Sequence, residues 1–229
     1  MAVRLTGDRE KPALLLIHGF PSSSESFRNV IGRRARDCFV ITPDLPGLGG
    51  SAPVERPSFS RFADMIDGLL ALLGAGSFHL YLHDHGAAVG LHPATRAPRR
   101  IRSLLVQNAN AHESGMGPQW SATRTYWDDP TPEREAEATA HLTFEGTRDY
   151  RFRAVREDCQ LSRSLAAPAL MRWGRHDIFF DLQETLSWMK ALPHMEAHIL
   201  DGPHLLLETH PAECAGLMSA FVRRTEGLR

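Results

Sequence analysis

Cysteine, lysine and long apolar runs are all scarce in this sequence. The three cysteines, Cys38, Cys159 and Cys214, are odd in number and widely spaced, so they form neither a disulfide framework nor a metal quartet. No stretch approaches the ~20 apolar residues that a membrane-spanning helix needs. The first residues also lack the apolar core of a secretory signal. We therefore expect a cytoplasmic protein with no membrane partner.

An excess of charge of one sign is also missing. The 26 Lys and Arg residues nearly balance the 27 Asp and Glu residues, and the formal net charge is −1. Such a chain has no bulk electrostatic attraction for nucleic acid or an anionic membrane. The 229 residues, of which 42% are hydrophobic, suffice for one α/β domain with a continuous core.

Short apolar runs recur along the chain and predict buried strands. They are continuous rather than alternating, as expected of strands covered on both faces in a parallel sheet. The predicted strands are residues 13–17, 38–41, 78–82, 101–106, 169–173 and 197–200. Helical patterns lie between or after them, at 62–73 (before Gly74), 187–192 and 205–222. This alternation predicts an α/β fold with a mostly parallel, doubly wound sheet.

The alternation stops once, between residues 111 and 167. This segment is polar, with the acidic stretch 133–137, and we interpret it as a largely helical cap inserted into a core of residues 1–110 and 168–229. Trp120, Tyr126, Trp127 and Tyr150 are its candidate pocket residues. The aromatic cluster of Trp120, Tyr126 and Trp127 either lines a substrate pocket or forms the small core of the cap.

Residues 80–88, Leu-Tyr-Leu-His-Asp-His-Gly-Ala-Ala, run from a predicted strand straight into small residues that open a helix. This layout is typical of a nucleophile elbow, a tight strand-to-helix turn that presents one side chain above the sheet edge. The presented side chain is Asp84. The helix N-terminus supplies backbone N–H groups for developing negative charge. An Asp that merely caps the following helix is the alternative.

A carboxylate at this position favours displacement at an sp³ carbon. A serine there would form an ether, which water does not readily cleave, whereas a carboxylate forms an ester that can be hydrolysed. Epoxides and carbon–halogen bonds suit such a step. The sequence therefore predicts a hydrolase that passes through an alkyl ester on Asp84.

Three further segments complete a predicted catalytic set. After the first strong strand, His-Gly-Phe-Pro (18–21) predicts that the Phe20 backbone N–H forms an oxyanion hole with the N–H of His85, the residue after the nucleophile. Asp177 follows the strand at 169–173, and His204 follows the last strand. Asp177 would orient the imidazole of His204, which would activate water. Glu113 is the reserve candidate for the orienting acid.

Taken together, these motifs resemble the α/β-hydrolase superfamily, in particular its branch of epoxide hydrolases and haloalkane dehalogenases. The resemblance covers nearly the whole chain and rests on residues 18–21, 44–51, 83–86, 107–111, 173–177 and 202–204. It implies an α/β-hydrolase fold and the chain order nucleophile, acid, histidine, here 84, 177 and 204.

The chain departs from that branch in three ways. His85 stands where the branch usually has a Trp that holds a departing halide, and Phe20 stands where dehalogenases often have Asn. Epoxide hydrolases need cap tyrosines, for which Tyr126 and Tyr150 are the candidates. The insertion is expected to be short, with residues lost between Tyr150 and Pro168, and the sheet is expected to lack its first one or two strands.

The twelve histidines predict no metal site, because no His-Glu-x-x-His or comparable ligand spacing occurs. We expect no cofactor, a small-molecule substrate, no nucleic-acid partner, and a monomer or homodimer. Epoxide hydrolysis to a diol is the first functional hypothesis, with Asp84 as nucleophile and a cap acid such as Tyr126. A haloalkane or haloacid dehalogenase, a non-catalytic ligand-binding protein, and a lyase or cyclase that uses Asp84 as a base remain alternatives.

Overall fold

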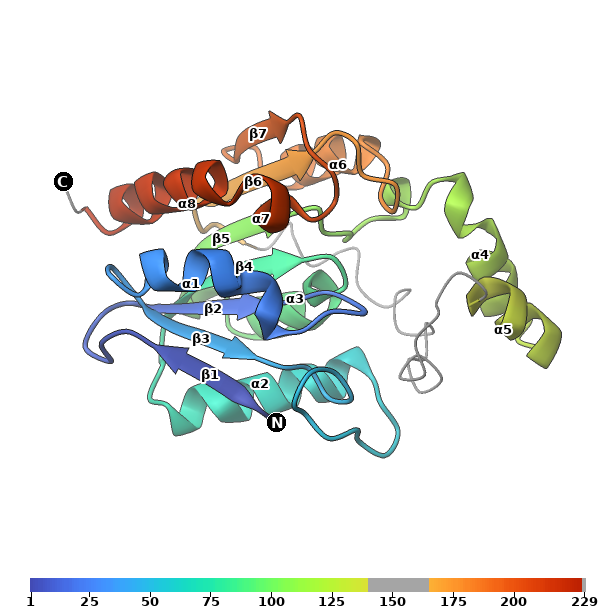
Figure 1. Ribbon diagram of the computed structural model, residues 1–229, viewed down its shortest axis with the longest axis horizontal. Coiled ribbons are helices and arrows are strands. Elements are labelled where there is room, and N and C mark those ends of the chain that lie inside the picture. The colour runs from blue at the N-terminus through green and yellow to red at the C-terminus, as the bar shows by residue number, and fades with distance from the viewer. Residues whose placement is uncertain (140–164, 228–229) are drawn as a thin grey trace.

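A seven-stranded sheet runs through the residues that the computed structural model describes, 1–139 and 165–227 (Figure 1). Its strand order is β1-β3-β2-β4-β5-β6-β7. All neighbouring pairs are parallel except β1 with β3. The strands are β1 (Val3–Thr6), β2 (Ala13–Ile17), β3 (Phe39–Pro43), β4 (Phe78–His83), β5 (Ile101–Gln107), β6 (Ala169–Gly174) and β7 (Glu196–Leu200).

The predicted α/β fold with a mostly parallel sheet is confirmed, and the six predicted strands are present. The sequence pattern did not predict β1. That strand has four residues, one of them Arg4, and it lies half-exposed at the sheet edge, so it has no continuous apolar run. Strands β2 and β4, by contrast, are buried along their whole length.

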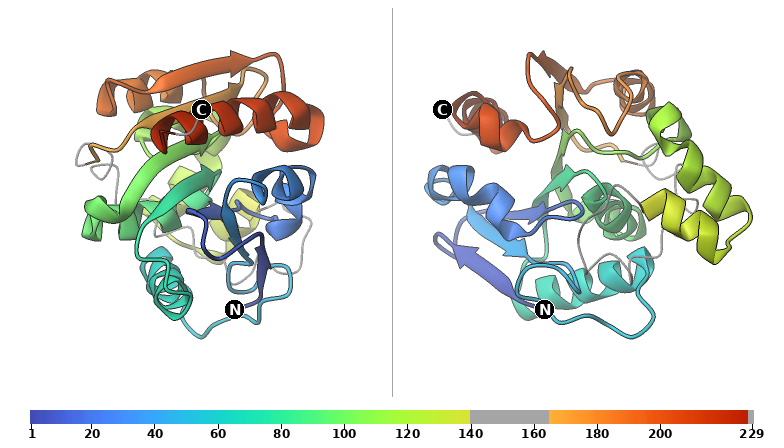
Figure 2. Two further views of the ribbon diagram at one scale, coloured as in Figure 1. Left: turned by 90° about the vertical axis from the view of Figure 1, so that its left-hand side faces the viewer. Right: turned by 45° about the vertical axis from the view of Figure 1, so that its right-hand side comes forward.

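Helices cover both faces of the sheet (Figure 2). The core on one face includes residues of α2 (Phe59–Leu72), α3 (Gly86–Arg96) and α6 (Gln183–Ala191). The core on the other face includes residues of α1 (Arg28–Arg34), α7 (Leu206–Thr209) and α8 (Pro211–Thr225). Two short 3-10 helices, η1 (Ser24–Phe27) and η2 (Pro98–Arg100), precede α1 and β5.

Local chemistry explains the helix ends. The Ser58 side chain accepts a hydrogen bond from the Arg61 N–H at the start of α2, and Gly74 beyond its end adopts a φ of +70°. The prediction of one helix over 205–222 is wrong, because α7 ends at Thr209 and α8 starts at Pro211. Proline suits the first helical position, since its nitrogen has no hydrogen to donate.

The described part of the insertion lies beyond the carboxyl ends of the parallel strands, where α4 and α5 run beside each other (Figure 1). It consists of η3 (Glu113–Gly115), η4 (Pro118–Trp120), α4 (Ser121–Asp128) and α5 (Pro132–Thr139). The domain boundaries after 110 and 167 stay predictions. Tyr150, and most of the segment in which residues were predicted to be lost, lie outside the described residues.

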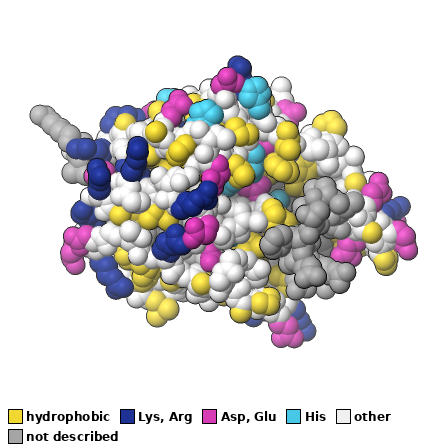
Figure 3. Space-filling view, in the orientation of Figure 1, with side chains coloured by type: hydrophobic (Ala, Val, Ile, Leu, Met, Phe, Trp, Pro, Cys, Tyr) yellow, Lys and Arg dark blue, Asp and Glu magenta, His cyan; other side chains and the backbone are white. Residues whose placement is uncertain are grey.

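Acidic and basic side chains lie next to one another on the face shown in Figure 3, in keeping with the near-zero net charge. Among the ion pairs of the described residues is that of Arg28 in α1 with Glu208 in α7. None of the described helices has both the length and the apolarity needed to cross a bilayer.

Candidate active site

Asp84 occupies a sharp turn between β4 and α3. Its φ of +54° lies in the left-handed region, which non-glycine residues adopt rarely and often at functional sites. Two glycines allow neighbouring segments to approach. A Cβ on Gly86 would lie 2.6 Å from the carbonyl oxygen of Ile17, and one on Gly19 would lie 2.2 Å from the Asp84 Cβ. The turn therefore has the geometry of a nucleophile elbow.

The loop after β2 places a backbone donor against the Asp84 carboxylate. The Phe20 N–H donates to Asp84 Oδ1 at 2.7 Å. His18 holds this loop, since its Nδ1 lies 2.7 Å from the Gly19 carbonyl oxygen and its Nε2 accepts the Leu45 N–H at 2.9 Å. Burial lowers the pKa of His18, so the neutral ring can make both hydrogen bonds.

His204 joins Asp84 and Asp177 in one chain of contacts. Its Nε2 lies 3.5 Å from Asp84 Oδ2, and its Nδ1 lies 2.9 Å from Asp177 Oδ2. All three side chains are almost fully buried, with exposures of 8% or less. The structure thus brings together the three residues that the sequence predicted as nucleophile, base and orienting acid. Glu113, the reserve acid, is instead exposed in η3.

Asn108, to which the sequence analysis gave no role, connects the elbow to the acid loop. Its backbone carbonyl accepts the Asp84 N–H at 3.1 Å, and its side-chain Nδ2 donates to Asp177 Oδ2 at 2.7 Å. Its Oδ1 accepts the Gly174 N–H at 3.0 Å. Its position at the end of β5, beside β4, was the available signal, because such strand ends meet at one edge of the sheet.

Backbone N–H groups hold the second oxygen of Asp177. Phe179 and Phe180 donate to Asp177 Oδ1 at 2.7 and 3.1 Å. Both carboxylate oxygens therefore have hydrogen-bond partners, and Oδ2 is aimed at His204. This arrangement fixes the imidazole orientation that a general base needs.

The electrostatics of the site favour an ion pair. Burial alone would lower the pKa of His204, but hydrogen bonds to Asp177 and Asp84 and their negative charges raise it to about 9. Burial alone would raise the pKa of Asp84. The charges of His85 and His204 and the hydrogen bond from His204 outweigh burial and lower that pKa well below its ordinary value. At neutral pH the site therefore holds a carboxylate on Asp84 and an imidazolium on His204.

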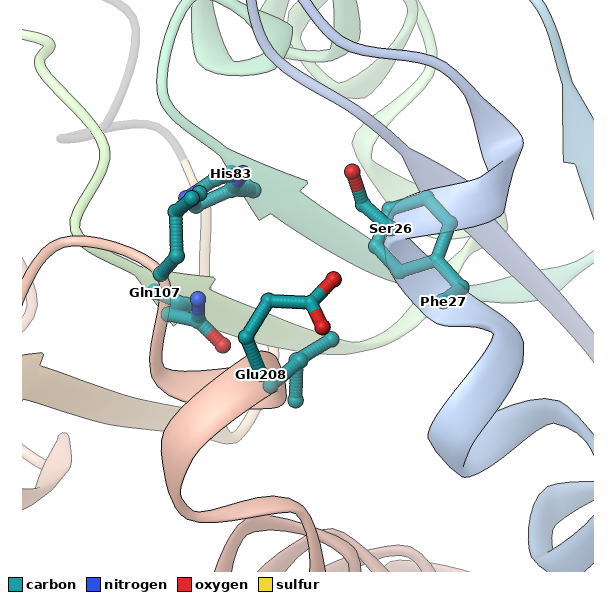
Figure 4. Close-up of a pocket in the computed structure, with 7 residues that line it drawn as sticks. Ser26, Phe27, His83, Gln107 and Glu208 are labelled. Atoms are coloured by element: carbon teal, nitrogen blue, oxygen red, sulfur yellow. The ribbon is translucent and has the colours of Figure 1, made fainter.

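His83, the residue before Asp84, is buried beside His204. Burial and the charge of His204 lower the pKa of His83 to about 3, and its ring lies 4.7 Å from the His204 ring. His83 also lines a hollow of about 210 Å³, which includes space open to solvent. Figure 4 shows His83 and Gln107 on one side of that hollow, with Ser26 and Phe27 across from them.

The structure describes three of the four predicted pocket residues. Trp120 lies against the site, with its ring stacked on Phe180 at 5.8 Å and edge-on to His85 at 5.8 Å. Trp127 lies behind it, with its ring 6.2 Å from that of Trp120. Tyr126 is half-buried on α4, and Tyr150 lies outside the described residues.

The described residues contain no group of three or more His, Cys, Asp or Glu side chains placed to hold a metal ion.

Comparison with known proteins places this site in context. The chain is 29% identical over 254 residues to an uncharacterized hydrolase, YNR064C, of Saccharomyces cerevisiae, covering 90% of this chain and 88% of the yeast protein. It is 26% identical over 264 residues to a fluoroacetate dehalogenase from a Burkholderia species, covering 92% and 87%. A shorter match, 35% identical over 106 residues, joins 44% of the chain to 29% of mouse Epoxide hydrolase 4.

Solved structures agree on the fold. Haloalkane dehalogenase DbeA from Bradyrhizobium elkani superposes with a TM-score of 0.74 at 22% identity, covering 98% of this chain and 94% of that one. A hydrolase from Pseudomonas aeruginosa gives a TM-score of 0.78 at 20% identity, covering 96% and 93%. Residues 12–150 match the family described as alpha/beta hydrolase fold. The chain belongs to the alpha/beta hydrolase fold family.

Proposed function

We propose that this hydrolase displaces a leaving group from an sp³ carbon through an alkyl ester on Asp84, with epoxides as the first substrate class. One observation carries the proposal: the elbow side chain is a carboxylate whose Oδ2 faces His204 Nε2 at 3.5 Å. A carboxylate in this position suits a two-step displacement, because its ester can be hydrolysed.

The two carboxylate oxygens of Asp84 have different roles in the first step. Oδ1 is held by the Phe20 N–H, so it remains as the carbonyl oxygen of the ester. Oδ2 attacks the less hindered carbon of the epoxide, the ring C–O bond breaks, and the released oxygen takes a proton from an acid in the site. The product is a hydroxyalkyl ester of Asp84.

Esterification then prepares His204 for the second step. The carboxylate charge of Asp84 is one cause of the raised pKa of His204, about 9. The neutral ester removes that charge, so the pKa of His204 falls and the imidazolium releases its proton. The neutral ring, oriented by Asp177, draws a proton from water as the water attacks the ester carbonyl.

Backbone donors receive the negative charge of this attack. It develops on Oδ1, where the Phe20 N–H already donates, and the predicted second donor is the His85 N–H. Collapse of the intermediate breaks the bond from the acyl carbon to the alkyl oxygen, and His204 returns a proton to give the diol. Asp84 is regenerated as a carboxylate.

A dehalogenase is the second candidate, because the similarity to a fluoroacetate dehalogenase spans 92% of the chain. The first step is the same, with halide as the leaving group. Halide release needs N–H donors beside the nucleophile, for which His85 and a cap Trp are the candidates. The Trp120 indole N–H donates instead to the Phe179 carbonyl at 2.7 Å, so we propose the epoxide first.

Trapping the ester tests the proposal. His204→Gln removes the base, so incubation with a panel of epoxides and haloalkanes should add the mass of an alkyl group, localised to Asp84 by peptide mapping. The double variant Asp84→Asn/His204→Gln is the control and should gain no mass. A His204→Gln protein that stays unmodified by every compound would exclude the displacement. Diol formation and halide release by the unmodified enzyme separate the two candidates.

The same experiment separates the remaining alternatives. A ligand-binding protein would bind a panel compound without turnover, and its affinity would be unchanged in Asp84→Asn. A lyase or cyclase that uses Asp84 as a base would form product but no covalent adduct.

A further inference from the structure

The side chain of His85 lies in a setting of aromatic rings that the proposed mechanism does not yet use. Only 7% of the residue is exposed. Four rings from separate parts of the chain surround its imidazole, with centroids 5.8 to 6.4 Å away: Phe20, Phe59, Trp120 and Phe180. These residues come from the loop after β2, the start of α2, η4 and the loop after β6.

Two neighbours of this imidazole also contact Asp84 or His204. The Phe20 backbone binds Asp84 Oδ1, and the Phe20 ring lies 6.4 Å from the His85 ring. The Phe180 ring lies 5.7 Å from His204 and 6.2 Å from His85. Phe20, which binds Asp84, and Phe180, which packs near His204, therefore both pack near His85.

One aromatic face is stacked against the imidazole of His85. Aromatic faces attract cations, and the Phe59 ring lies nearly parallel to the imidazole, at an interplanar angle of 19°. The Asp84 carboxylate is adjacent in the chain, and the charge of His85 contributes to the lowered pKa of Asp84. The rings also limit access of water to the imidazole.

The first half-reaction needs an acid at this place. An epoxide oxygen leaves as an alkoxide unless it is protonated while the C–O bond breaks. His204 is a poor choice, because its Nε2 faces the attacking Asp84 Oδ2 at 3.5 Å, whereas the oxygen leaves from the opposite side of the carbon. Tyr126, the cap acid suggested by the sequence, is half-buried on α4.

We propose that the His85 imidazolium is the catalytic acid that protonates the leaving oxygen as Asp84 attacks. The new bond joins Asp84 Oδ2 to the ring carbon, the C–O bond of the epoxide breaks, and the N–H proton of His85 passes to the freed oxygen. His85 is left neutral and regains a proton from solvent after the ester is hydrolysed. This assignment rests on the proposed function, and it gives a role to the buried side chain of His85.

The test compares two leaving groups in the trapping background His204→Gln. One substrate is a terminal epoxide, and the other is the primary bromide of the same carbon skeleton, whose leaving group needs no proton. His85→Phe keeps a ring in the aromatic surroundings, and His85→Gln keeps a neutral N–H donor. We expect both changes to slow epoxide trapping by about 10²-fold, the usual size of a general-acid contribution, and to slow bromide trapping only a few-fold.

The matched control is His194→Gln. His194 is exposed just before the amino end of β7, whereas the site lies at the carboxyl ends of the parallel strands. It should leave both trapping rates unchanged. Epoxide trapping at the parental rate in His85→Phe overturns the assignment. An equal loss with both substrates also overturns it, because His85 would then act on the nucleophile. A parent that forms no ester with either substrate overturns the proposed function and this inference together, and thermal melts identify any variant that fails to fold.

Discussion

The sheet edge and the helical insertion are held in place by different means. At the edge, Asp84, Asn108 and Asp177 exchange hydrogen bonds with one another and with backbone groups of neighbouring loops. In the described part of the insertion, side chains make most of the contacts to the core. Trp120 and Gln119 both donate to the Phe179 carbonyl, at 2.7 and 2.6 Å.

We expect this difference to separate the proposed chemistry, at the sheet edge, from substrate binding, at the insertion. Backbone hydrogen bonds fix the groups of the proposed mechanism, and they depend little on side-chain identity. Trp120 and Trp127 lie at the same edge, and we expect that they can change with little effect on the contacts between Asp84, His204 and Asp177. A substitution at the edge should therefore affect chemistry or folding, whereas one in the insertion should affect substrate binding.

The largest expected effect is at Asp177. Asp177→Asn keeps the size of the side chain but removes its negative charge from His204, and we expect turnover to fall on the order of 10³-fold. The pKa of His204 should fall from about 9, because Asp177 is the first of the groups that raise it. Turnover assays and an NMR titration of the imidazole measure the two effects.

The same variant should change how stability depends on pH. The pKa of His204 in the folded protein, about 9, lies above its ordinary 6.5, so the paired histidine stabilises the native state fully below pH 6.5. That contribution is lost as the pH rises from 6.5 to 9. Urea unfolding of the native protein should show this loss, and Asp177→Asn should show a smaller one. Identical slopes would mean that the ion pair contributes little.

The next largest effect is expected at Gly86. In Gly86→Ala the new methyl would lie 2.6 and 2.7 Å from the carbonyl oxygens of Ile17 and His18, both fixed backbone atoms. We expect a loss of about 1–3 kcal/mol in the free energy of unfolding. Gly216→Ala on α8 is the matched control, since a Cβ added there would meet no atom within 4 Å apart from its own stretch of helix backbone. That change should leave stability unchanged or raise it by up to about 1 kcal/mol.

A smaller effect is expected where the insertion meets the core. Trp120→Phe keeps a ring to stack on Phe180 but removes the indole N–H. This loss should lower the free energy of unfolding by about 1 kcal/mol. The Gln119 side chain donates to the same carbonyl. Gln119→Ala should therefore lower the free energy of unfolding less in the native background than in the Trp120→Phe background. Stability and KM, measured in a double-mutant cycle, test this. A large drop in kcat would show that Trp120 takes part in the chemistry.

The smallest effect is expected on the exposed face of α5. Glu137 is solvent-exposed there, so Glu137→Ala should change the free energy of unfolding by no more than about 0.5 kcal/mol. Kinetic constants should also stay the same. A measurable change in KM would extend the substrate-binding surface to α5.

The sheet and the proximity of Asp84, Asp177 and His204 were predictable because their signals are local. Strands β2 and β4 are continuous apolar runs, and the residues that follow the strands carry Asp84, Asp177 and His204 to one edge. Register and chain order then suffice to bring them together.

The aromatic surroundings of His85 were not predictable in this way. Phe59 and Phe180 come from segments about 120 residues apart, and only packing brings both rings to His85. The role of Asn108 likewise depends on the path of the 174–180 loop, which no sequence period encodes. Strand β1 was missed because a half-exposed edge strand of four residues has no distinctive pattern.

One buried carboxylate links the two regions compared here. Glu184 of α6 has no exposed surface and accepts the backbone N–H groups of Ala111 and His112 at 2.8 and 3.1 Å. Asp181 lies four residues beyond Asp177, and its N–H donates to the Gly115 carbonyl at 2.9 Å. The first turn of the insertion is therefore hydrogen-bonded both to Glu184 and to the loop that carries Asp177. We expect a ligand that displaces this turn to act, through these hydrogen bonds, on the loop that carries Asp177.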